Sequence, residues 1–194
     1  MKKQSISTKK IVLTALLAAL TVAGSALRIT MPLSIAGTTS FHLGNILCAL
    51  SGILLGPWFG GLAAGMGSAI YDMMNPLYIS ECWITFITKG LYGLVVGLIA
   101  WSGRKAWQAD SEKSYAKLYI ATVSGALTYA VLYLSKGFFY DGLLLSGLTA
   151  KAAMINVVAK LPATGFNAAV AIICAPLLAI AISTALKKAH LTLE

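Results

Sequence analysis

Polar side chains interrupt the apolar stretches of this sequence at a small number of positions. Asn45, Lys89, Asn156 and Lys160 fall inside stretches that are otherwise apolar. Such side chains are costly in lipid unless they face protein or water, so they are candidates for function. With other polar residues near the ends of these stretches, they predict a polar cavity that opens to the outside of a membrane and binds a small ligand. The candidate binding residues are Arg28, His42, Asn45, Asp72, Trp83, Lys89, Tyr133, Lys136, Asn156 and Lys160.

Several of these residues also have simpler explanations. Arg28 and Lys136 stand near the ends of apolar stretches, where long cationic side chains commonly reach toward lipid head groups. Asp72 can simply end a helix, and a single histidine such as His42 is more typical of an interfacial hydrogen-bonding group than of a metal ligand. Both explanations stay open at these positions.

The aromatic residues are equally ambiguous. Trp83 and Tyr133, together with Tyr78 and Tyr140, suit stacking against a ring in a ligand. A belt of aromatic side chains at the membrane surface explains the same residues equally well.

The sequence lacks the motifs of known membrane enzymes and pumps. It contains no HExxH, no GxSxG, no pair of intramembrane aspartates and no GxxxxGK[ST] phosphate loop. Cys48, Cys82 and Cys174 are widely spaced and form no CxxC, so neither a zinc site nor a disulfide framework is indicated. We therefore expect no catalytic residues, no metal and no cofactor. The alternatives are a small polytopic membrane enzyme, a structural scaffold and a stand-alone secondary transporter, although no internal repeat typical of such transporters is visible.

The composition places these residues in a membrane protein. The chain has 194 residues, of which 58% are hydrophobic and only 11% charged, and its mean hydropathy is +0.82. Soluble domains carry roughly 25% charged residues, so a large soluble domain is excluded. The net charge of +9 comes from cations that cluster at the ends of apolar segments, which argues against nucleic acid as a partner.

The apolar segments predict an all-α bundle of six transmembrane helices in a single domain, residues 1–194. Ten of the fifteen lysines and arginines lie at the termini or in the charged segment 102–117, so the positive-inside rule predicts cytoplasmic N- and C-termini. The N-terminal run is expected to be a retained first span rather than a signal peptide, because no clear cleavage pattern follows it. The predicted spans are 11–27, 43–56, 58–74, 83–101, 118–134 and 155–186.

Turn-forming residues set the expected connections between these spans. Gly56 and Pro57 predict a tight turn, because proline lacks the amide proton that a helix interior needs. Residues 29–41 are expected to form a long outer loop and residues 102–117 a solvated charged loop. Pro162 and Pro176 predict a kink or a separate short helix within the last span.

A stripe of small residues marks the first span. Ala15, Ala19 and Ala23 recur four residues apart and therefore share one face of a helix. A face without bulk lets another helix approach closely in lipid, which makes it a candidate partner-docking surface. The general abundance of alanine in membrane helices is the competing explanation.

These features together resemble a known family. Six spans in about 190 residues, the alanine stripe, the segment HLGNILCALSGILLGPWFGGLAAGMGSAIYDMMNP and the final Lys160-Leu161-Pro162 with Asn167 are similar to the S components of energy-coupling factor (ECF) transporters for vitamins. Such proteins capture a micronutrient and have no energy source of their own.

The resemblance implies partners, a mechanism and a location. A transmembrane coupling subunit would dock on Ala15, Ala19 and Ala23, and two cytoplasmic ATPases would supply the energy. The S component would topple in the membrane to carry its ligand inward, with residues 29–41 as a lid. The ligand is expected to be a water-soluble vitamin or precursor, with pantothenate or pyridoxine slightly favoured, and the location a prokaryotic plasma membrane.

Overall fold

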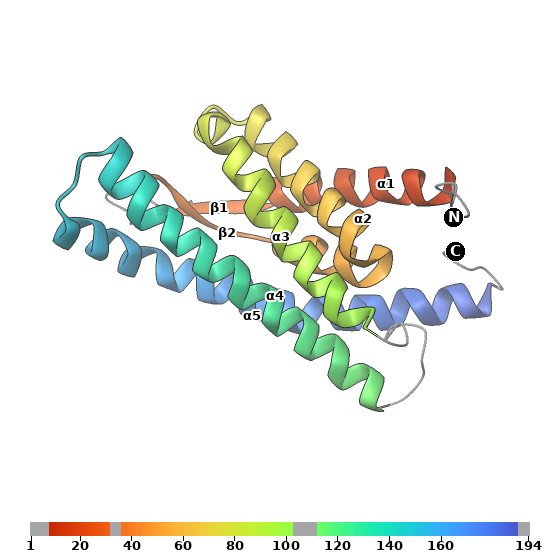
Figure 1. The fold of residues 1–194 in the computed structure, drawn as a ribbon. Helices are drawn as coiled ribbons and strands as arrows, with labels where there is room; N and C mark the ends of the chain where they lie inside the picture. Colours follow the sequence, from red (N-terminus) through yellow and green to blue (C-terminus); the bar gives the residue numbers. More distant parts are fainter. Residues whose placement is uncertain (1–7, 32–35, 103–111, 190–194) are drawn as a thin grey trace, which may run out of the picture.

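The computed structural model describes residues 8–31, 36–102 and 112–189, and they are mostly helical (Figure 1). Five helices are long and apolar enough to cross a membrane, and large side chains such as Val12, Leu127 and Leu177 are more than half exposed on their outer faces. This is the pattern of helices that face lipid. The helices are α1 (Thr8–Ala26), α2 (Gly44–Met74), α3 (Cys82–Ala100), α4 (Glu112–Lys136) and α5 (Ala150–Lys188).

Gly56 divides α2 into two arms, residues 44–55 and 57–74. Its backbone leaves the helical region at φ 80° and ψ −174°, a conformation that glycine tolerates, and Pro57 follows. The arms lie against each other, with the Cys48 Sγ and Ser68 Oγ atoms 3.6 Å apart. The expected turn at Gly56-Pro57 therefore exists, and it separates two helical arms. With these arms counted together as α2, five helices of the described residues are long and apolar enough to cross a membrane, and the count of six crossings stays a prediction.

Close backbone contacts join α2 to α3. A β-carbon added to Gly52 would lie 2.4 Å from the Gly93 carbonyl oxygen, and one added to Gly97 would lie 2.5 Å from the carbonyl carbon of Gly56. Helices in lipid associate through such small-residue faces. This interface adjoins the apolar core, which includes Ile53 and Val96.

A small antiparallel sheet stands where the sequence predicted a loop. β1 (Arg28–Met31) pairs with β2 (Thr39–His42), and Arg28 lies opposite His42. Residues 32–35 of the expected lid lie outside the described residues. One short hairpin is thus the correction to the predicted all-α fold. Its position depends on contacts with residues of α4 and α5, which are distant from it in the sequence.

Two helices are longer than the sequence predicted. α4 begins at Glu112, within the expected charged loop, because Ser114 and Leu118 already lie on its buried face; residues 103–111 of that loop lie outside the described part. α4 then continues into a π-helix, Gly137–Leu145. α5 runs as one helix from Ala150 to Lys188 through Pro162 and Pro176, so no separate short helix forms.

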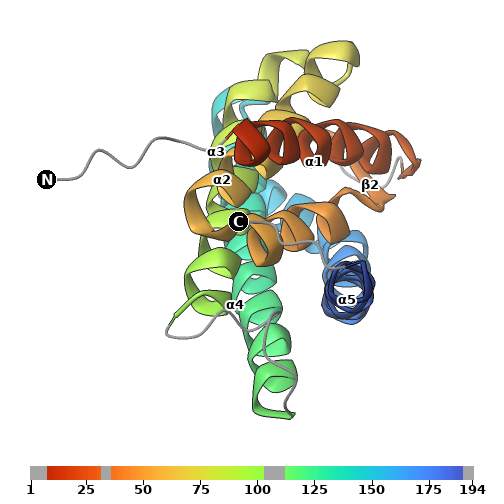
Figure 2. The same ribbon diagram turned by 90° about the vertical axis from the view of Figure 1, so that its right-hand side faces the viewer.

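The helix ends gather at two opposite ends of the molecule. The start of α1, the start of α4 and the end of α5 lie toward one end of the molecule, and the π-helix and the start of α5 lie toward the other (Figures 1 and 2). α4 and α5 run antiparallel beside each other, with the β-hairpin next to them. The hairpin and the ends of these helices surround the candidate site.

Candidate binding site

A polar cavity lies among β2, α3, α4 and the second arm of α2. It contains about 740 Å³ of space not filled by protein atoms, a volume that includes part of the open surroundings, and about 70 Å³ of it can hold the centre of a water molecule. The cavity is therefore small and partly open. Its lining residues are Ser25, Arg28, Thr38, Thr39, Ser40, His42, Ser68, Asp72, Tyr78, Glu81, Ile84, Thr85, Thr88, Lys89, Tyr129, Tyr133, Lys136, Thr164 and Asn167.

Helical spacing brings these side chains to one place. On α3, Thr88 and Lys89 follow Thr85 by three and four residues, so both lie on the same side of the helix as Thr85. On α4, Tyr129 and Tyr133 are also four apart, and their rings stack with centroids 5.7 Å apart. Each helix therefore turns one polar stripe toward the cavity while its other faces meet apolar side chains or lipid.

Lys89 lies at the inner wall of the cavity and is only 4% exposed. Its ammonium group donates a hydrogen bond to the Asn45 side-chain oxygen. It also lies 3.7 Å from the centroid of the Tyr129 ring, within the range of a cation–π interaction. These contacts fix the cation beside the aromatic wall.

Arg28 is a second cationic residue in the wall of the cavity. Its Nε donates to the Ser25 carbonyl oxygen at 2.8 Å, which turns the side chain back along the end of α1. The guanidinium carbon lies 4.1 Å from the Tyr71 ring centroid and 4.7 Å from that of Tyr78. The two rings hold the charge in place without neutralising it.

His42 is positioned by its neighbours and kept neutral. Its backbone amide donates to the Asn167 side-chain oxygen at 2.9 Å, and its Nδ1 accepts from the Gly44 amide at 3.2 Å. Desolvation, followed by the positive charges of Lys89 and Arg28, lowers the pKa of His42 well below its ordinary value of about 6.5. The imidazole is therefore available as a hydrogen-bonding group without adding charge.

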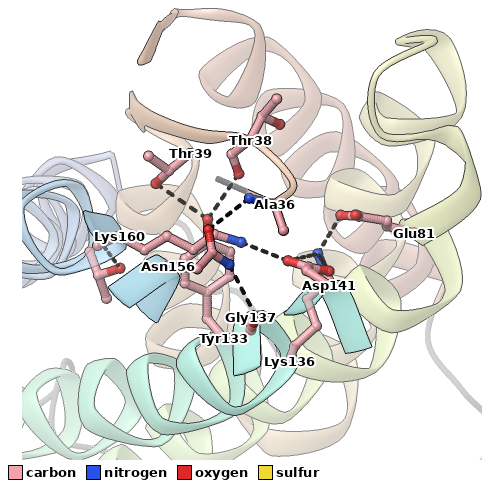
Figure 3. Close-up of polar contacts among 11 residues, drawn as sticks. Ala36, Thr38, Thr39, Glu81, Tyr133, Lys136, Gly137, Asp141, Asn156 and Lys160 are labelled. Atoms are coloured by element: carbon pink, nitrogen blue, oxygen red, sulfur yellow. Dashed lines mark hydrogen bonds and ion pairs between the residues drawn. The ribbon is translucent and has the colours of Figure 1, made fainter. Parts of the chain in front are cut away.

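Four charged residues form a buried network beside the cavity (Figure 3). Asp141, on the π-helix, lies 2.6 Å from the Lys160 ammonium through Oδ2 and 3.0 Å from the Lys136 ammonium through Oδ1. Lys136 also pairs with Glu81 at the start of α3. Two cations thus meet two carboxylates, and the network ties α3, α4 and α5 together.

Side chains of α4 and α5 hold residues 36–42 against this network, and Figure 3 shows the contacts of Ala36, Thr38 and Thr39. Asn156 accepts from the Ala36 amide at 2.9 Å and donates to the Gly137 carbonyl at 3.3 Å. The Tyr133 hydroxyl donates to the Thr38 carbonyl oxygen or to Thr39 Oγ1, each 3.3 Å away. Asn167 donates to the Ser40 carbonyl oxygen at 2.8 Å. The strand that walls the cavity is therefore fixed at both ends and in the middle.

The structure separates the candidate residues into three groups. Asn45, Asn156 and Lys160 are buried behind the cavity wall and contact residues that support it. Trp83 is 55% exposed and packs edge-on against Tyr140, away from the cavity. The candidates that line the cavity are Arg28, His42, Asp72, Lys89, Tyr133 and Lys136.

Other lining residues were not singled out from the sequence. Thr85, Thr88 and Tyr129 are uncharged or aromatic, so only their helical spacing from Lys89 and Tyr133 could have indicated them. The hydroxyls of β2 had no detectable signal, because their position depends on Asn167 and Tyr133, more than 90 residues further along the chain. Among the residues described, no three His, Cys, Asp or Glu side chains come together to hold a metal ion.

A separate surface lies on α1. Ala15, Ala19 and Ala23 are all exposed, whereas Thr14, Leu17, Ala18 and Thr21 form the face that packs into the molecule. The alanine stripe is therefore not used for packing within the described part of the chain.

Known proteins resemble this chain along most of its length. Residues 5–184 match the sequence profile of the family described as ECF-type riboflavin transporter, S component. An uncharacterized protein in gap 3'region of Pyrococcus woesei is 32% identical over 124 residues, which cover 64% of this chain and 74% of that protein. A UPF0397 protein of Streptococcus gordonii is 30% identical over 129 residues, covering 66% of this chain and 67% of the relative.

Proposed function

The chain belongs to the family of ECF-type riboflavin transporter S components, and from that premise we propose that it is the substrate-capture subunit of an energy-coupling factor transporter. It binds a water-soluble vitamin or precursor outside the cell and delivers it inward when docked on its partners. The observation that carries this proposal is the polar cavity, lined by β2 and by residues of all five long helices, in a bundle whose outer faces are apolar.

The chemistry of the cavity supports two kinds of ligand group. The stacked rings of Tyr129 and Tyr133 suit a flat heteroaromatic ring, such as that of pyridoxine or of the riboflavin named in the family description. The cations Arg28 and Lys89 suit a carboxylate or phosphate, as in pantothenate. The hydroxyls of Thr38, Thr39, Ser40, Thr85 and Thr88 add donors and acceptors for a polar ligand.

The exposed alanine stripe supports docking on a transmembrane coupling subunit. A smooth helix face gives the partner a surface on which it can pack closely in lipid. Two cytoplasmic ATPases on the coupling subunit then supply the energy. Under this proposal the protein lies in a prokaryotic plasma membrane, and the cation-bearing ends of α1 and α5 support a cytoplasmic location for these ends, with the cavity toward the outside.

Reconstitution tests this proposal. The chain is co-expressed with the coupling subunit and ATPases of its own organism, purified, and placed in liposomes, and uptake of labelled riboflavin, pantothenate and pyridoxine is measured with and without ATP. A stable complex and ATP-dependent uptake of one vitamin are expected, and an ATPase variant without hydrolysis is the control. Failure to associate with any coupling subunit, or turnover of a substrate by the isolated chain, would contradict the proposal.

A further inference from the structure

Three lysines surround the cavity, of which Lys89 and Lys160 are buried and Lys136 is partly buried, and two of the three form ion pairs. Lys136 pairs with Glu81 and Asp141, and Lys160, which is fully buried, pairs with Asp141. Burying a charge without a counter-charge is costly, and these pairs remove that cost. In this network, carboxylates neutralise the two lysines that connect the helices.

Lys89 is equally buried but has no such partner. Its ammonium group meets the amide oxygen of Asn45 and the ring of Tyr129, and both groups are neutral. Among the residues that the structure describes, no carboxylate oxygen lies within 4.0 Å of it. Asn45 and Tyr129 orient the cation without balancing its charge, and Lys89 lines the cavity.

The charges that line the cavity do not cancel. Lys136 and Glu81 form an ion pair, so they contribute no net charge. Arg28 and Lys89 are cations outside any ion pair of the described residues, and Asp72 is the one lining carboxylate outside such a pair. His42 adds no charge when neutral. One positive charge is therefore left over among the residues that line the cavity.

We propose that Lys89 is a specificity-determining residue that binds an anionic group of the ligand, so that the captured molecule is an anion carrying a carboxylate or a phosphate. This inference rests on the proposed function and narrows its ligand class. The bound anion would balance the charge of Lys89, as Glu81 and Asp141 balance the charges of Lys136 and Lys160. The adjacent Tyr129 ring would contact the organic part of the same molecule. A charge-assisted hydrogen bond of this kind strengthens binding by about tenfold to a hundredfold.

Matched probes separate the charge of the ligand from its shape. Dissociation constants are measured by calorimetry for the full chain in lipid nanodiscs. Pantothenate is compared with panthenol, in which a hydroxymethyl group replaces the carboxylate, and flavin mononucleotide with riboflavin, which lacks the phosphate. The anionic member of one pair should bind about tenfold or more tightly than its neutral partner. The pair that responds distinguishes a carboxylate ligand from a phosphate ligand.

Substitution of the lysine then tests the assignment to this residue. Lys89→Met keeps the length and apolar stem of the side chain and should abolish the preference for the anion, whereas Lys89→Arg should keep it. Lys151→Met is the matched control, because Lys151 is exposed at the start of α5 and does not line the cavity. The comparison of probes on the unaltered chain needs no variant, so the test survives a variant that does not fold.

The outcomes distinguish this inference from the transport proposal. If neither anionic probe bound more tightly than its neutral partner, the inference would be overturned while vitamin capture stayed intact. An anion preference that persists in Lys89→Met, or failure of both anionic probes to bind, would also overturn it. Absence of a complex with a coupling subunit would contradict the transport proposal regardless of the ligand charge.

Discussion

Asp141 balances two buried lysines, so its charge matters more than its size. Asp141→Asn keeps the shape of the side chain but leaves Lys136 and Lys160 with one carboxylate, Glu81, which contacts only Lys136. Removing one partner of a buried ion pair typically costs about 3–5 kcal/mol. We expect a large fall in the thermal midpoint of the detergent-solubilised protein, measured by scanning fluorimetry.

Asp72 provides the contrast for this prediction. It is also buried, but no lysine or arginine nitrogen of the described residues lies within 4.0 Å of its carboxylate. Asp72→Asn should therefore lower the thermal midpoint less than Asp141→Asn does. Equal effects of the two substitutions would show that the ion pairs contribute little.

His42 should make the stability of the protein depend on pH. Its folded-state pKa lies well below 6.5, mainly through desolvation and then through Lys89 and Arg28. Between these two pKa values the unfolded chain binds the proton and the folded chain does not. Stability from this group is therefore complete above about pH 6.5 and is lost as the pH falls, by at most about 1.4 kcal/mol per pH unit.

A variant without His42 isolates that effect. His42→Asn can still accept from the Gly44 amide, and it should reduce the fall in thermal midpoint between pH 7.5 and pH 5.5. His190, the second histidine of the chain, supplies the control as His190→Asn. An unchanged pH dependence in His42→Asn would rule out His42 as its source.

At the scale of elements, the contact between α2 and α3 should tolerate no added carbon. A β-carbon on Gly52 would lie 2.4 Å from a backbone oxygen of α3, so the helices would have to separate. Overpacking of this kind typically costs about 1–3 kcal/mol. Gly52→Ala should lower the thermal midpoint and weaken ligand binding, because α3 carries Lys89.

Gly165 is the matched control within α5. A β-carbon there would meet nothing within 4 Å, and alanine favours helix over glycine by up to about 1 kcal/mol. Gly165→Ala should leave the thermal midpoint unchanged or raise it. A similar loss in both variants would mean that the close contact of α2 and α3 is not what limits stability.

The sequence predicts those elements that depend on local pattern. The apolar runs predict the long helices, and Gly56-Pro57 predicts the reversal within α2. The β-hairpin was missed, because Asn167 and Tyr133 fix β2 from other helices. The start of α4 was also placed too late, because charged residues around Glu112 resemble a loop when the buried face of the helix is unknown.

The candidate site was also harder to predict, because its arrangement depends on contacts between residues that are distant in the sequence. Charged candidates such as Arg28 and Lys89 stand out in apolar sequence, and the structure places both on the cavity wall. Lys160 stands out equally, yet it is buried in an ion pair behind that wall. The sequence indicates that a lysine in an apolar stretch needs a partner for its charge. Only the folded structure shows that Lys160 pairs with Asp141 and that Lys89 forms no ion pair among the described residues.

At the scale of the whole molecule, capture and energy coupling should be separable by mutation. The alanine stripe of α1 is exposed on the face away from the packed core. Ala19→Trp should reduce co-purification with the coupling subunit and uptake by about tenfold or more, while ligand binding to the isolated chain stays nearly unchanged.

Leu127→Trp is the control for bulk in the membrane. Leu127 is 62% exposed on α4, outside the alanine stripe. This variant should assemble and transport normally. If Ala19→Trp reduced ligand binding as much as uptake, the stripe would be part of the folded core rather than a docking surface.

The length of the first arm of α2 limits how far apart its two ends can lie in the membrane. Residues 44–55 span about 18 Å at 1.5 Å per residue, whereas the hydrocarbon core of a bilayer is about 30 Å thick. The arm starts beside His42 on the cavity wall and ends at the Gly56 turn. These two ends of the arm therefore cannot lie at opposite surfaces of the bilayer, because the arm is shorter than the hydrocarbon core is thick.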